Sequence, residues 1–224
     1  MSIQKYLVGI GLLIVVCLGL WESQAKRREL PVSFQEEENG QKIAALTFDD
    51  GPHPVYTEAL LDGLKKRNVK ATFFLIGKSA EKYPELVKRM AEEGHLIGNH
   101  TMNHVQLNLQ SYEQALEEIR EGNDIICQLT GQLPQYIRPP FGEWSEDLSE
   151  EVNMTAVLWD VDPCYWKVQN TQTVVSRVLK NFENGDIILL HDVYKSSVDA
   201  ALELIDIMQA KGYEFATVDE ILLD

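Results

Sequence analysis

Two adjacent aspartates and a closely spaced pair of histidines are the residues of this 224-residue chain that most directly indicate chemistry. Asp49 and Asp50 stand in the run Thr-Phe-Asp-Asp-Gly-Pro, and two neighbouring carboxylates near a core need a cation or a shared proton. His100 and His104 are four residues apart, so on a helical turn both rings would reach one ion. Two imidazoles and one carboxylate form a three-ligand set of the Zn²⁺ type that leaves a position for water.

Two further polar residues follow apolar stretches. Arg138 heads the run Arg-Pro-Pro-Phe-Gly, a rigid turn whose guanidinium would hold a carboxylate, either in a site or in a structural salt bridge. His191 ends the apolar run Ile-Ile-Leu-Leu-His, where a lone histidine also fits a satisfied core position. A His-Glu-x-x-His metalloprotease motif is excluded, because Thr101 stands where its glutamate would be.

The elements that must position these residues alternate along the chain. Apolar and amphipathic runs predict strands at 43–48, 70–76, 95–98, 135–138, 154–160, 186–191 and 212–216. Helices are expected at 56–68, 79–93, 111–130, 172–182, 197–211 and 218–222. This alternation implies an α/β fold with parallel strands and helices outside, which an open doubly wound sheet and a (β/α) barrel both satisfy.

The candidate residues share one position relative to these strands. Each group follows the carboxyl end of a strand, where barrel active sites are built. The groups are Asp49 and Asp50, His100 and His104, Arg138, Asp160 and Asp162, and His191. Chance placement of one such group is common, whereas five together favour a single site.

Charge and hydropathy divide the chain. The net charge is −15, with four basic residues and one acidic residue in 1–28 and 16 basic against 34 acidic residues in 29–224. So acidic a surface argues against nucleic acid as the main partner. We expect a signal or anchor segment at 1–28, an acidic linker at 29–41 and a catalytic domain at 42–224.

The apolar run at 6–21 carries no charge. As a helix it would measure roughly 24 Å, slightly less than a ~30 Å hydrocarbon core, so it fits a signal-peptide core or a short membrane anchor. Small residues precede a possible cleavage point after Ala25. We therefore expect an exported protein, anchored in the cell membrane and facing the cell wall, or secreted if cleaved after Ala25.

The segments from 42 to about 222 resemble the NodB-homology polysaccharide deacetylases, carbohydrate esterase family 4. Thr-Phe-Asp-Asp-Gly-Pro, His-Thr-x-x-His, Arg-Pro-Pro-Phe-Gly and Leu-Leu-His-Asp occur in the order of that family. The resemblance implies a distorted (β/α)₇ barrel, here preceded by an apolar N-terminal helix. It also implies a metal-dependent hydrolase that removes N-acetyl groups from an amino-sugar polysaccharide.

The resemblance assigns a role to each candidate residue. Asp49 would be the general base, oriented by Arg138, and His191 would be the general acid. The backbone N–H of Phe141 would donate to the oxyanion. The ligands of a divalent metal, Zn²⁺ or another such as Co²⁺, would be Asp50, His100 and His104. The substrate contacts would be Pro140, Phe141, Trp166 and Leu189.

One position departs from the family pattern. The fourth family motif is Asp-x-x-Asp-Trp, and its second aspartate pairs with the acid histidine, but here Tyr165 stands in its place. Without that anion the pKa of His191 should fall, so the acid would be weaker or supported by Tyr165, Asp192 or Asp160. A Tyr165→Asp variant should then raise turnover without changing metal affinity.

Three functions remain open at this stage. The first is N-deacetylation of glycan containing N-acetylglucosamine, with cell-wall peptidoglycan favoured over chitin-like oligomers or poly-N-acetylglucosamine. The second is removal of O-acetyl groups, as from xylan, by the same fold. The third is glycan binding with weakened or lost catalysis, which the tyrosine at 165 motivates. Acetate release, measured against an Asp49→Ala control, separates the third from the other two.

Overall fold

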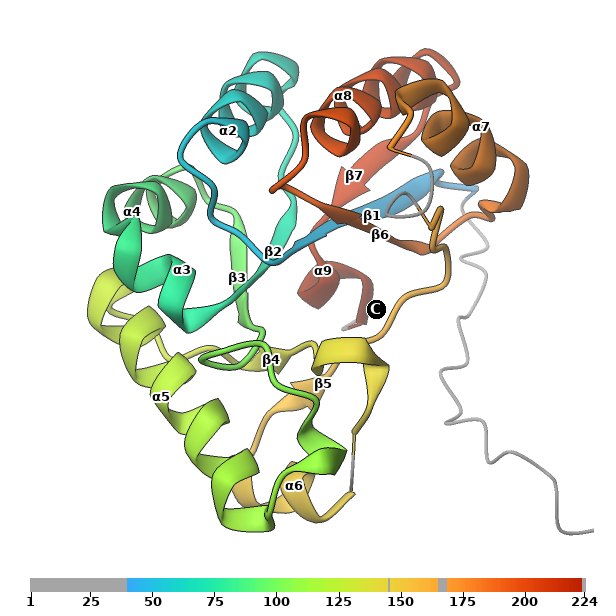
Figure 1. The fold of residues 1–224 in the computed structure, drawn as a ribbon. Coiled ribbons are helices and arrows are strands. Elements are labelled where there is room, and N and C mark those ends of the chain that lie inside the picture. Colours follow the sequence, from blue (N-terminus) through green and yellow to red (C-terminus); the bar gives the residue numbers. More distant parts are fainter. Residues whose placement is uncertain (1–39, 145, 165–168, 223–224) are drawn as a thin grey trace, which may run out of the picture. The chain divides into compact units, whose positions relative to one another are not determined.

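The computed structural model describes residues 40–144, 146–164 and 169–222 (Figure 1). The predicted apolar helix at 6–21, most of the linker at 29–41, and both Tyr165 and Trp166 lie outside these residues. Among the described residues, no helix combines the length and apolar character that a membrane crossing requires.

The described chain alternates strands and helices, as the sequence pattern predicts. The strands are β1 (Ile43–Asp49), β2 (Thr72–Leu75), β3 (Leu96–Asn99), β4 (Tyr136–Ile137), β5 (Thr155–Ala156), β6 (Ile187–His191) and β7 (Glu214–Ala216). The α-helices are α2 (Tyr56–Arg67), α3 (Gly77–Lys82), α4 (Pro84–Glu92), α5 (Tyr112–Thr130), α6 (Glu146–Val152), α7 (Thr171–Asn181), α8 (Lys195–Ala210) and α9 (Val218–Leu222). Two 3₁₀ turns are η2 (Leu107–Leu109) and η3 (Pro140–Gly142).

All these strands belong to one parallel sheet, in the order β5-β4-β3-β2-β1-β6, with β7 paired to the start of β1. The sheet curves into a ring because the chain after β5 returns to β6. There, Val161 forms a single parallel bridge with Ile188, and the Leu189 N–H donates to the Val161 carbonyl at 2.9 Å. This is the distorted barrel that the resemblance implied, closed on one side by isolated pairing instead of a full strand.

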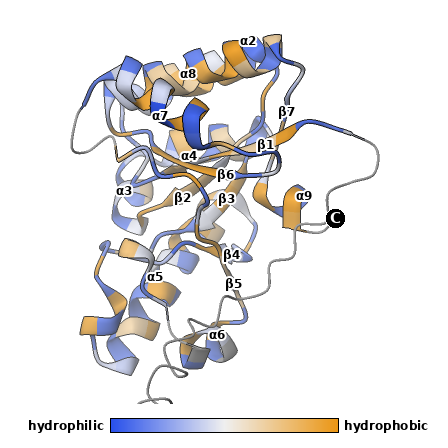
Figure 2. Cartoon of the chain, turned by 90° about the vertical axis from the view of Figure 1, so that its right-hand side faces the viewer, coloured by the Kyte–Doolittle hydropathy of each residue, from blue (hydrophilic) through white to orange (hydrophobic). Residues whose placement is uncertain are grey.

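The two faces of β1 have different surroundings, as expected for side chains that alternate along a strand. Leu46 and Phe48 join the main core, which α2, α7 and α8 cover. Thr47 and Asp49 lie on the opposite face, towards the barrel interior, and are also buried. In Figure 2, α8 carries hydrophobic and hydrophilic residues, consistent with one face packed on the sheet and one in solvent.

Two predicted elements differ from the structure. The helix expected at 79–93 is split into α3 and α4, because Pro84 lacks an N–H and disfavours helical geometry at Tyr83, whose φ and ψ are −129° and 58°. The strand expected at 154–160 is reduced to β5, and the chain then leaves the sheet before it reaches the Val161 bridge. By contrast, α5 begins after the predicted cap Ser111, which forms a capping box, and ends at Gly131.

Candidate active site

The carboxyl ends of β1 and β6 bring the first two candidate residues together. Asp49 is paired in register with His191 across these parallel strands, and their side chains lie on the interior face. Asp49 is only 3% exposed, so its carboxylate requires a buried partner. Two short apolar strands therefore end on a carboxylate and an imidazole at the same edge of the barrel.

Arg138 is the buried partner of Asp49. It is fully buried, and its Nη1 donates to Asp49 Oδ1 at 2.9 Å and to Thr47 Oγ1 at 2.7 Å. Its Nε and Nη2 donate to the carbonyls of Val157 and Leu158, at 3.1 and 2.8 Å. Because the guanidinium is fixed at several atoms, it holds the Asp49 carboxylate in one orientation.

Asp50 faces the two histidines of the predicted ligand set. Its Oδ1 lies 3.5 Å from His100 Nε2 and 3.4 Å from His104 Nε2. The three side chains come from two loops, since Asp50 follows β1 while His100 and His104 both follow β3. Burial would raise the pKa of Asp50, but the neighbouring His100, His191 and His104 bring it below its usual value.

The expectation that His100 and His104 share a helical turn is wrong. Residues 100–104 form a loop in which Thr101 and His104 have positive φ values of 64° and 56°. Glu118 of α5 holds this loop, because its carboxylate accepts hydrogen bonds from the backbone N–H and from the side-chain Nδ2 of Asn103, at 2.8 and 2.9 Å. The two rings nevertheless converge, with centroids 4.9 Å apart.

The donor set fits a divalent metal ion. One ligand atom each from Asp50, His100 and His104 lies within 4.8 Å of the others. Asp50 Oδ1 is buried and accepts no hydrogen bond among the described residues, an arrangement that a cation would complete. His100 Nδ1 lies 2.6 Å from the Arg138 carbonyl, which fixes that proton and leaves Nε2 as the ligand atom.

His191 completes this edge of the barrel. Its Nε2 lies 3.7 Å from Asp50 Oδ2, and its backbone N–H donates to Ser197 Oγ at 3.1 Å. Burial lowers the pKa of His191, although the Asp49 and Asp50 carboxylates oppose that effect. The imidazole is therefore held close to the predicted ligand Asp50.

Asp160 does not support His191, so this expectation is wrong. The Asp160 carboxylate accepts from the N–H of Ile187, the first residue of β6, whereas His191 is the last. It thus lies at the amino end of β6, away from the candidate site. The Asp192 carboxylate accepts a hydrogen bond at Oδ2 from Thr57 Oγ1 at 2.5 Å, while its Oδ1 is buried and accepts none among the described residues.

The predicted substrate contacts differ in their exposure. Phe141 is 63% exposed, has a φ of 62°, and places its ring 5.0 Å from that of His104. Pro140 is buried, and Leu189 is 6% exposed on the interior face of β6. Of these three residues, Phe141 therefore presents most surface to a ligand, while Trp166 lies outside the described residues.

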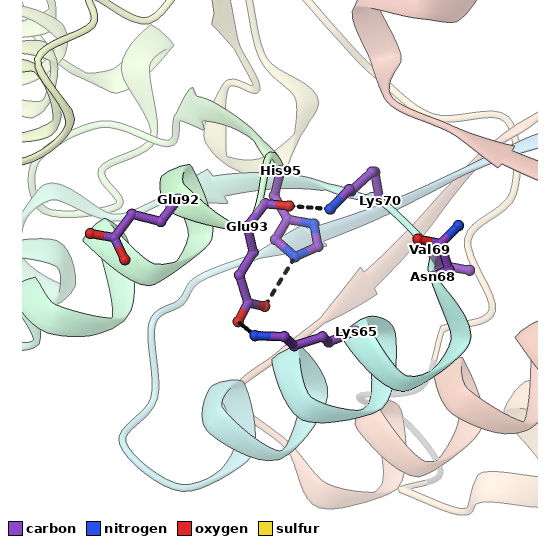
Figure 3. A pocket seen from close by; sticks show the side chains of 7 residues that line it. All are labelled: Lys65, Asn68, Val69, Lys70, Glu92, Glu93 and His95. Atoms are coloured by element: carbon purple, nitrogen blue, oxygen red, sulfur yellow. Dashed lines mark hydrogen bonds and ion pairs between the residues drawn. The ribbon is translucent and has the colours of Figure 1, made fainter.

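A cavity of about 260 Å³ lies at the opposite edge of the sheet, where β2 and β3 begin. It is lined by Lys65, Asn68, Val69, Lys70, Glu92, Glu93 and His95 (Figure 3). Lys65 Nζ forms a salt bridge with Glu93 Oε1 at 3.1 Å, and His95 Nε2 lies 4.0 Å from Glu93 Oε2. None of the predicted catalytic or metal-ligating residues lines this cavity.

The comparisons with known proteins agree with this fold and identify the family of the chain. The family model for polysaccharide deacetylase matches residues 36–157. PdaC of Bacillus subtilis, a peptidoglycan-N-acetylmuramic acid deacetylase, is 41% identical over 201 residues, covering 88% of this chain and 43% of that protein. A solved structure of PdaC has a TM-score of 0.79 at 43% identity and covers 81% of this chain and 90% of the other.

Two further similar proteins are a named deacetylase and a named pseudoenzyme. A peptidoglycan-N-acetylglucosamine deacetylase of Bacillus cereus is 38% identical over 195 residues, covering 84% of this chain and 91% of that protein. A pseudoenzyme of the CE4 family from Bacillus anthracis has a TM-score of 0.76 at 26% identity, covering 82% of this chain and 66% of the other. The chain belongs to the polysaccharide deacetylase family, although it spans less than half the length of PdaC.

Proposed function

We propose that this protein is a metal-dependent hydrolase that removes N-acetyl groups from a polysaccharide containing N-acetylglucosamine. One observation carries the proposal: the Arg138-bound Asp49 carboxylate stands beside the Asp50, His100 and His104 cluster at the carboxyl edge of a parallel barrel. A base and a metal set side by side are what hydrolysis of an unreactive amide requires.

Zn²⁺, or another divalent ion such as Co²⁺, fits the cluster of Asp50, His100 and His104. Such an ion, when bound, would act as a Lewis acid on the acetyl carbonyl and make an attacking water more acidic. Zn²⁺ is the first choice, because two neutral imidazoles and a carboxylate suit it better than they suit Mg²⁺ or Ca²⁺.

The residues around the cluster divide the proton transfers. Asp49 would accept a proton from the attacking water, and Arg138 would hold its carboxylate in a fixed orientation. The Phe141 N–H would donate to the developing oxyanion. His191 would give a proton to the leaving amine, because an amine leaves readily only when protonated. Base and acid thus come from paired positions of β1 and β6.

Peptidoglycan is the proposed substrate. The relatives from Bacillus subtilis and Bacillus cereus are named for deacetylation of its N-acetylmuramic acid and N-acetylglucosamine residues, respectively. The Phe141 side chain is exposed beside His104, so it offers an apolar surface on which a sugar ring would pack. Which of the two sugars loses its acetyl group is an outcome of the experiment below.

Export is part of the proposal, and it rests on the uncharged apolar run at 6–21, which follows Lys5 and precedes small residues at Ser23 and Ala25. The proposed substrate lies outside the cytoplasm, so the domain from residue 42 would face the cell wall. Cell fractionation with and without alkaline extraction distinguishes a membrane-anchored protein from one released after cleavage at Ala25. Recovery of the full-length protein in the cytosol would contradict export.

Glycan binding with weakened catalysis is a second candidate, favoured by Tyr165 in place of the family aspartate. The similarity to a protein from Bacillus anthracis that is named a pseudoenzyme of the family supports this candidate. An esterase that removes O-acetyl groups is a third candidate, because the same base and metal set would attack an ester.

Acetate release by the purified chain tests all three functions. The chain is loaded with Zn²⁺ and given defined peptidoglycan fragments acetylated on glucosamine alone, on muramic acid alone, or on a hydroxyl group. N-deacetylation that an Asp49→Ala variant lacks supports the proposal. Release only from the O-acetylated fragment supports the esterase, and binding without release from any fragment supports the binding module.

A further inference from the structure

A buried hydrogen bond joins the first turn of α2 to Asp192, the residue after β6, close to the candidate site. Asp192 follows His191 and is fully buried, and its Oδ2 accepts from Thr57 Oγ1 at 2.5 Å. The Thr57 hydroxyl, itself fully buried in α2, also accepts from the N–H of His53 at 2.7 Å. Neither side chain has a role in the reaction steps proposed above.

Asp192 also packs directly on the residue that follows Asp50. A Cβ atom added to Gly51 would lie 2.3 Å from both carboxylate oxygens of Asp192, far inside van der Waals contact. Asp192 therefore contacts the loop from Asp50 to His53 at two points. It packs directly on Gly51, and it binds the Thr57 hydroxyl, which accepts a hydrogen bond from the His53 N–H. Such close approach explains why glycine stands between Asp50 and Pro52.

This attachment matters for Asp50 because of its backbone conformation. Asp50 has a φ of 72°, a left-handed geometry that non-glycine residues rarely adopt unless their surroundings enforce it. That geometry turns its carboxylate towards His100 and His104, whereas the preceding Asp49 faces Arg138. A loop free to relax would lose this direction.

We propose that Thr57 and Asp192 are positioning residues that hold Asp50 in its metal-ligating conformation and fix its distance from His191. The inference rests on the proposed metal site. Asp192 acts through Gly51, on which it packs, and through Thr57, which carries the tie to His53. Asp192 is fully buried, and its Oδ1 accepts no hydrogen bond among the described residues, which is unfavourable for a polar atom. A solely structural role would therefore be served as well by an apolar side chain.

The test compares metal affinity in variants that remove or keep the contact. Thr57→Val and Asp192→Ala remove it, whereas Thr57→Ser keeps the hydroxyl and Asp192→Asn keeps the shape and an acceptor oxygen. Thr72→Val is the matched control, because Thr72 is equally buried and its hydroxyl accepts from the Val218 N–H at 3.0 Å, at the amino end of β2. Zn²⁺ affinity is measured by calorimetry, alongside the free energy of unfolding in a chelator.

We expect Thr57→Val and Asp192→Ala to weaken Zn²⁺ binding about tenfold or more, in the range seen when groups behind metal ligands are removed. Thr57→Ser, Asp192→Asn and Thr72→Val should bind Zn²⁺ as the wild type does. In Gly51→Ala the affinity should also fall, and adding Asp192→Ala should restore part of it by removing the clash.

The outcomes separate this inference from the proposed function. If Thr57→Val and Asp192→Ala lose stability as Thr72→Val does but keep full Zn²⁺ affinity, the positioning role is wrong and the metal site stands. If the affinities fall as expected but the wild type releases no acetate, the positioning role stands and the proposed reaction is wrong. A wild type without Zn²⁺ affinity, or with one that Asp50→Ala leaves unchanged, overturns both.

Discussion

Asp49 and Asp50 are neighbours in the chain but lie in two different environments. Asp49 continues the β1 pleat and meets the Arg138 guanidinium at 2.9 Å inside the barrel. Asp50 turns out of the strand with a positive φ and meets two imidazoles. The backbone change at Asp50 therefore gives the two carboxylates different main partners, although both lie near His100 Nε2, at 3.8 Å for Asp49 Oδ2 and 3.5 Å for Asp50 Oδ1. Each can thus take a different role.

This separation predicts different results for the two amide variants. Asp49→Asn should lower kcat by about 10²-fold or more, the usual effect of losing a general base, and leave Zn²⁺ affinity nearly unchanged. Asp50→Asn should lose both activity and Zn²⁺ affinity. Steady-state acetate release and calorimetry measure the two effects. Equal loss of Zn²⁺ affinity in both variants would show that the carboxylates share one role.

His95 predicts a pH-dependent stability at the other edge of the sheet. Burial lowers its pKa from 6.5 to about 4, so the folded protein keeps this ring neutral where the unfolded chain takes up a proton. Its stabilising contribution is therefore complete above about pH 6.5 and is lost as the pH falls towards 4. The loss amounts to about 3 kcal/mol at most.

Denaturant unfolding of the wild type and of His95→Asn between pH 7 and pH 4 measures this effect. The amide side chain of the variant keeps an acceptor for the Ala71 N–H, which now donates to His95 Nδ1 at 3.2 Å, and does not titrate. The stability advantage of the wild type should shrink as the pH falls, while all other titrating groups cancel. A constant difference between the two proteins would place the His95 pKa near its usual value.

Site residues that directly follow a predicted strand could be found from the sequence, because the apolar pattern of the strand locates them. Asp49, Arg138 and His191 each follow a short apolar run, and such runs end at the carboxyl edge of a parallel sheet. Thr57 and Asp192 are 135 positions apart, and a contact over that separation leaves no periodic signal. The role of Glu118 was also not predictable, because nothing in the sequence distinguishes this glutamate from the solvated glutamates beside it on the helix.

At the scale of elements, a loop replaces the expected helical turn between His100 and His104. Spacing alone suggested a shared helical face, but two residues with positive φ achieve the convergence by another route. The loop is tied down from outside: the Met102 N–H donates to the Glu118 carbonyl at 2.9 Å, and the Glu118 side chain binds Asn103. The helix α5 thus supports the loop of the proposed metal ligand His104, which it does not itself carry.

Glu118→Ala should therefore weaken Zn²⁺ affinity severalfold while lowering the free energy of unfolding by only about 1 kcal/mol. His104 is unchanged in this variant, but its loop loses the two hydrogen bonds from Asn103 to the Glu118 side chain. Glu117→Ala is the control, because Glu117 is exposed on the same helix one position earlier. Calorimetric titration with Zn²⁺ measures the affinity. An unchanged value in Glu118→Ala would mean that the backbone contacts of the loop, such as the bond from the Met102 N–H to the carbonyl of residue 118, hold it without the side chain.

Pro84 shows a second limit of periodic patterns. The apolar positions of 79–93 continue without a break in phase, so the pattern favours one helix. The backbone interrupts it at Tyr83, because Pro84 constrains the residue before it. Capping signals were more reliable, since Ser111 and Gly131 delimit α5 where the sequence pattern predicts its ends.

For the whole molecule, the proposed metal ligands link distant parts of the chain, since Asp50 follows β1 and the two histidines follow β3. Binding an ion there should stabilise the folded state by about 4 kcal/mol when free Zn²⁺ is roughly 1,000 times its dissociation constant. We expect the Tm to rise by several degrees with Zn²⁺ and to fall again with a chelator. In calorimetric scans, Asp50→Ala should abolish the shift, and an unchanged shift would place the ion elsewhere.

Strand pairing is weaker at the bridge between Val161 and Ile188 than elsewhere around the ring of strands. β1 has paired neighbours along its length, whereas this junction depends on one bridge and a few flanking hydrogen bonds. The amide protons of Val161 and Leu189 should therefore exchange with deuterium sooner than those of β1. Brief openings at this seam would leave the other strands paired, and would admit solvent close to the imidazole of His191.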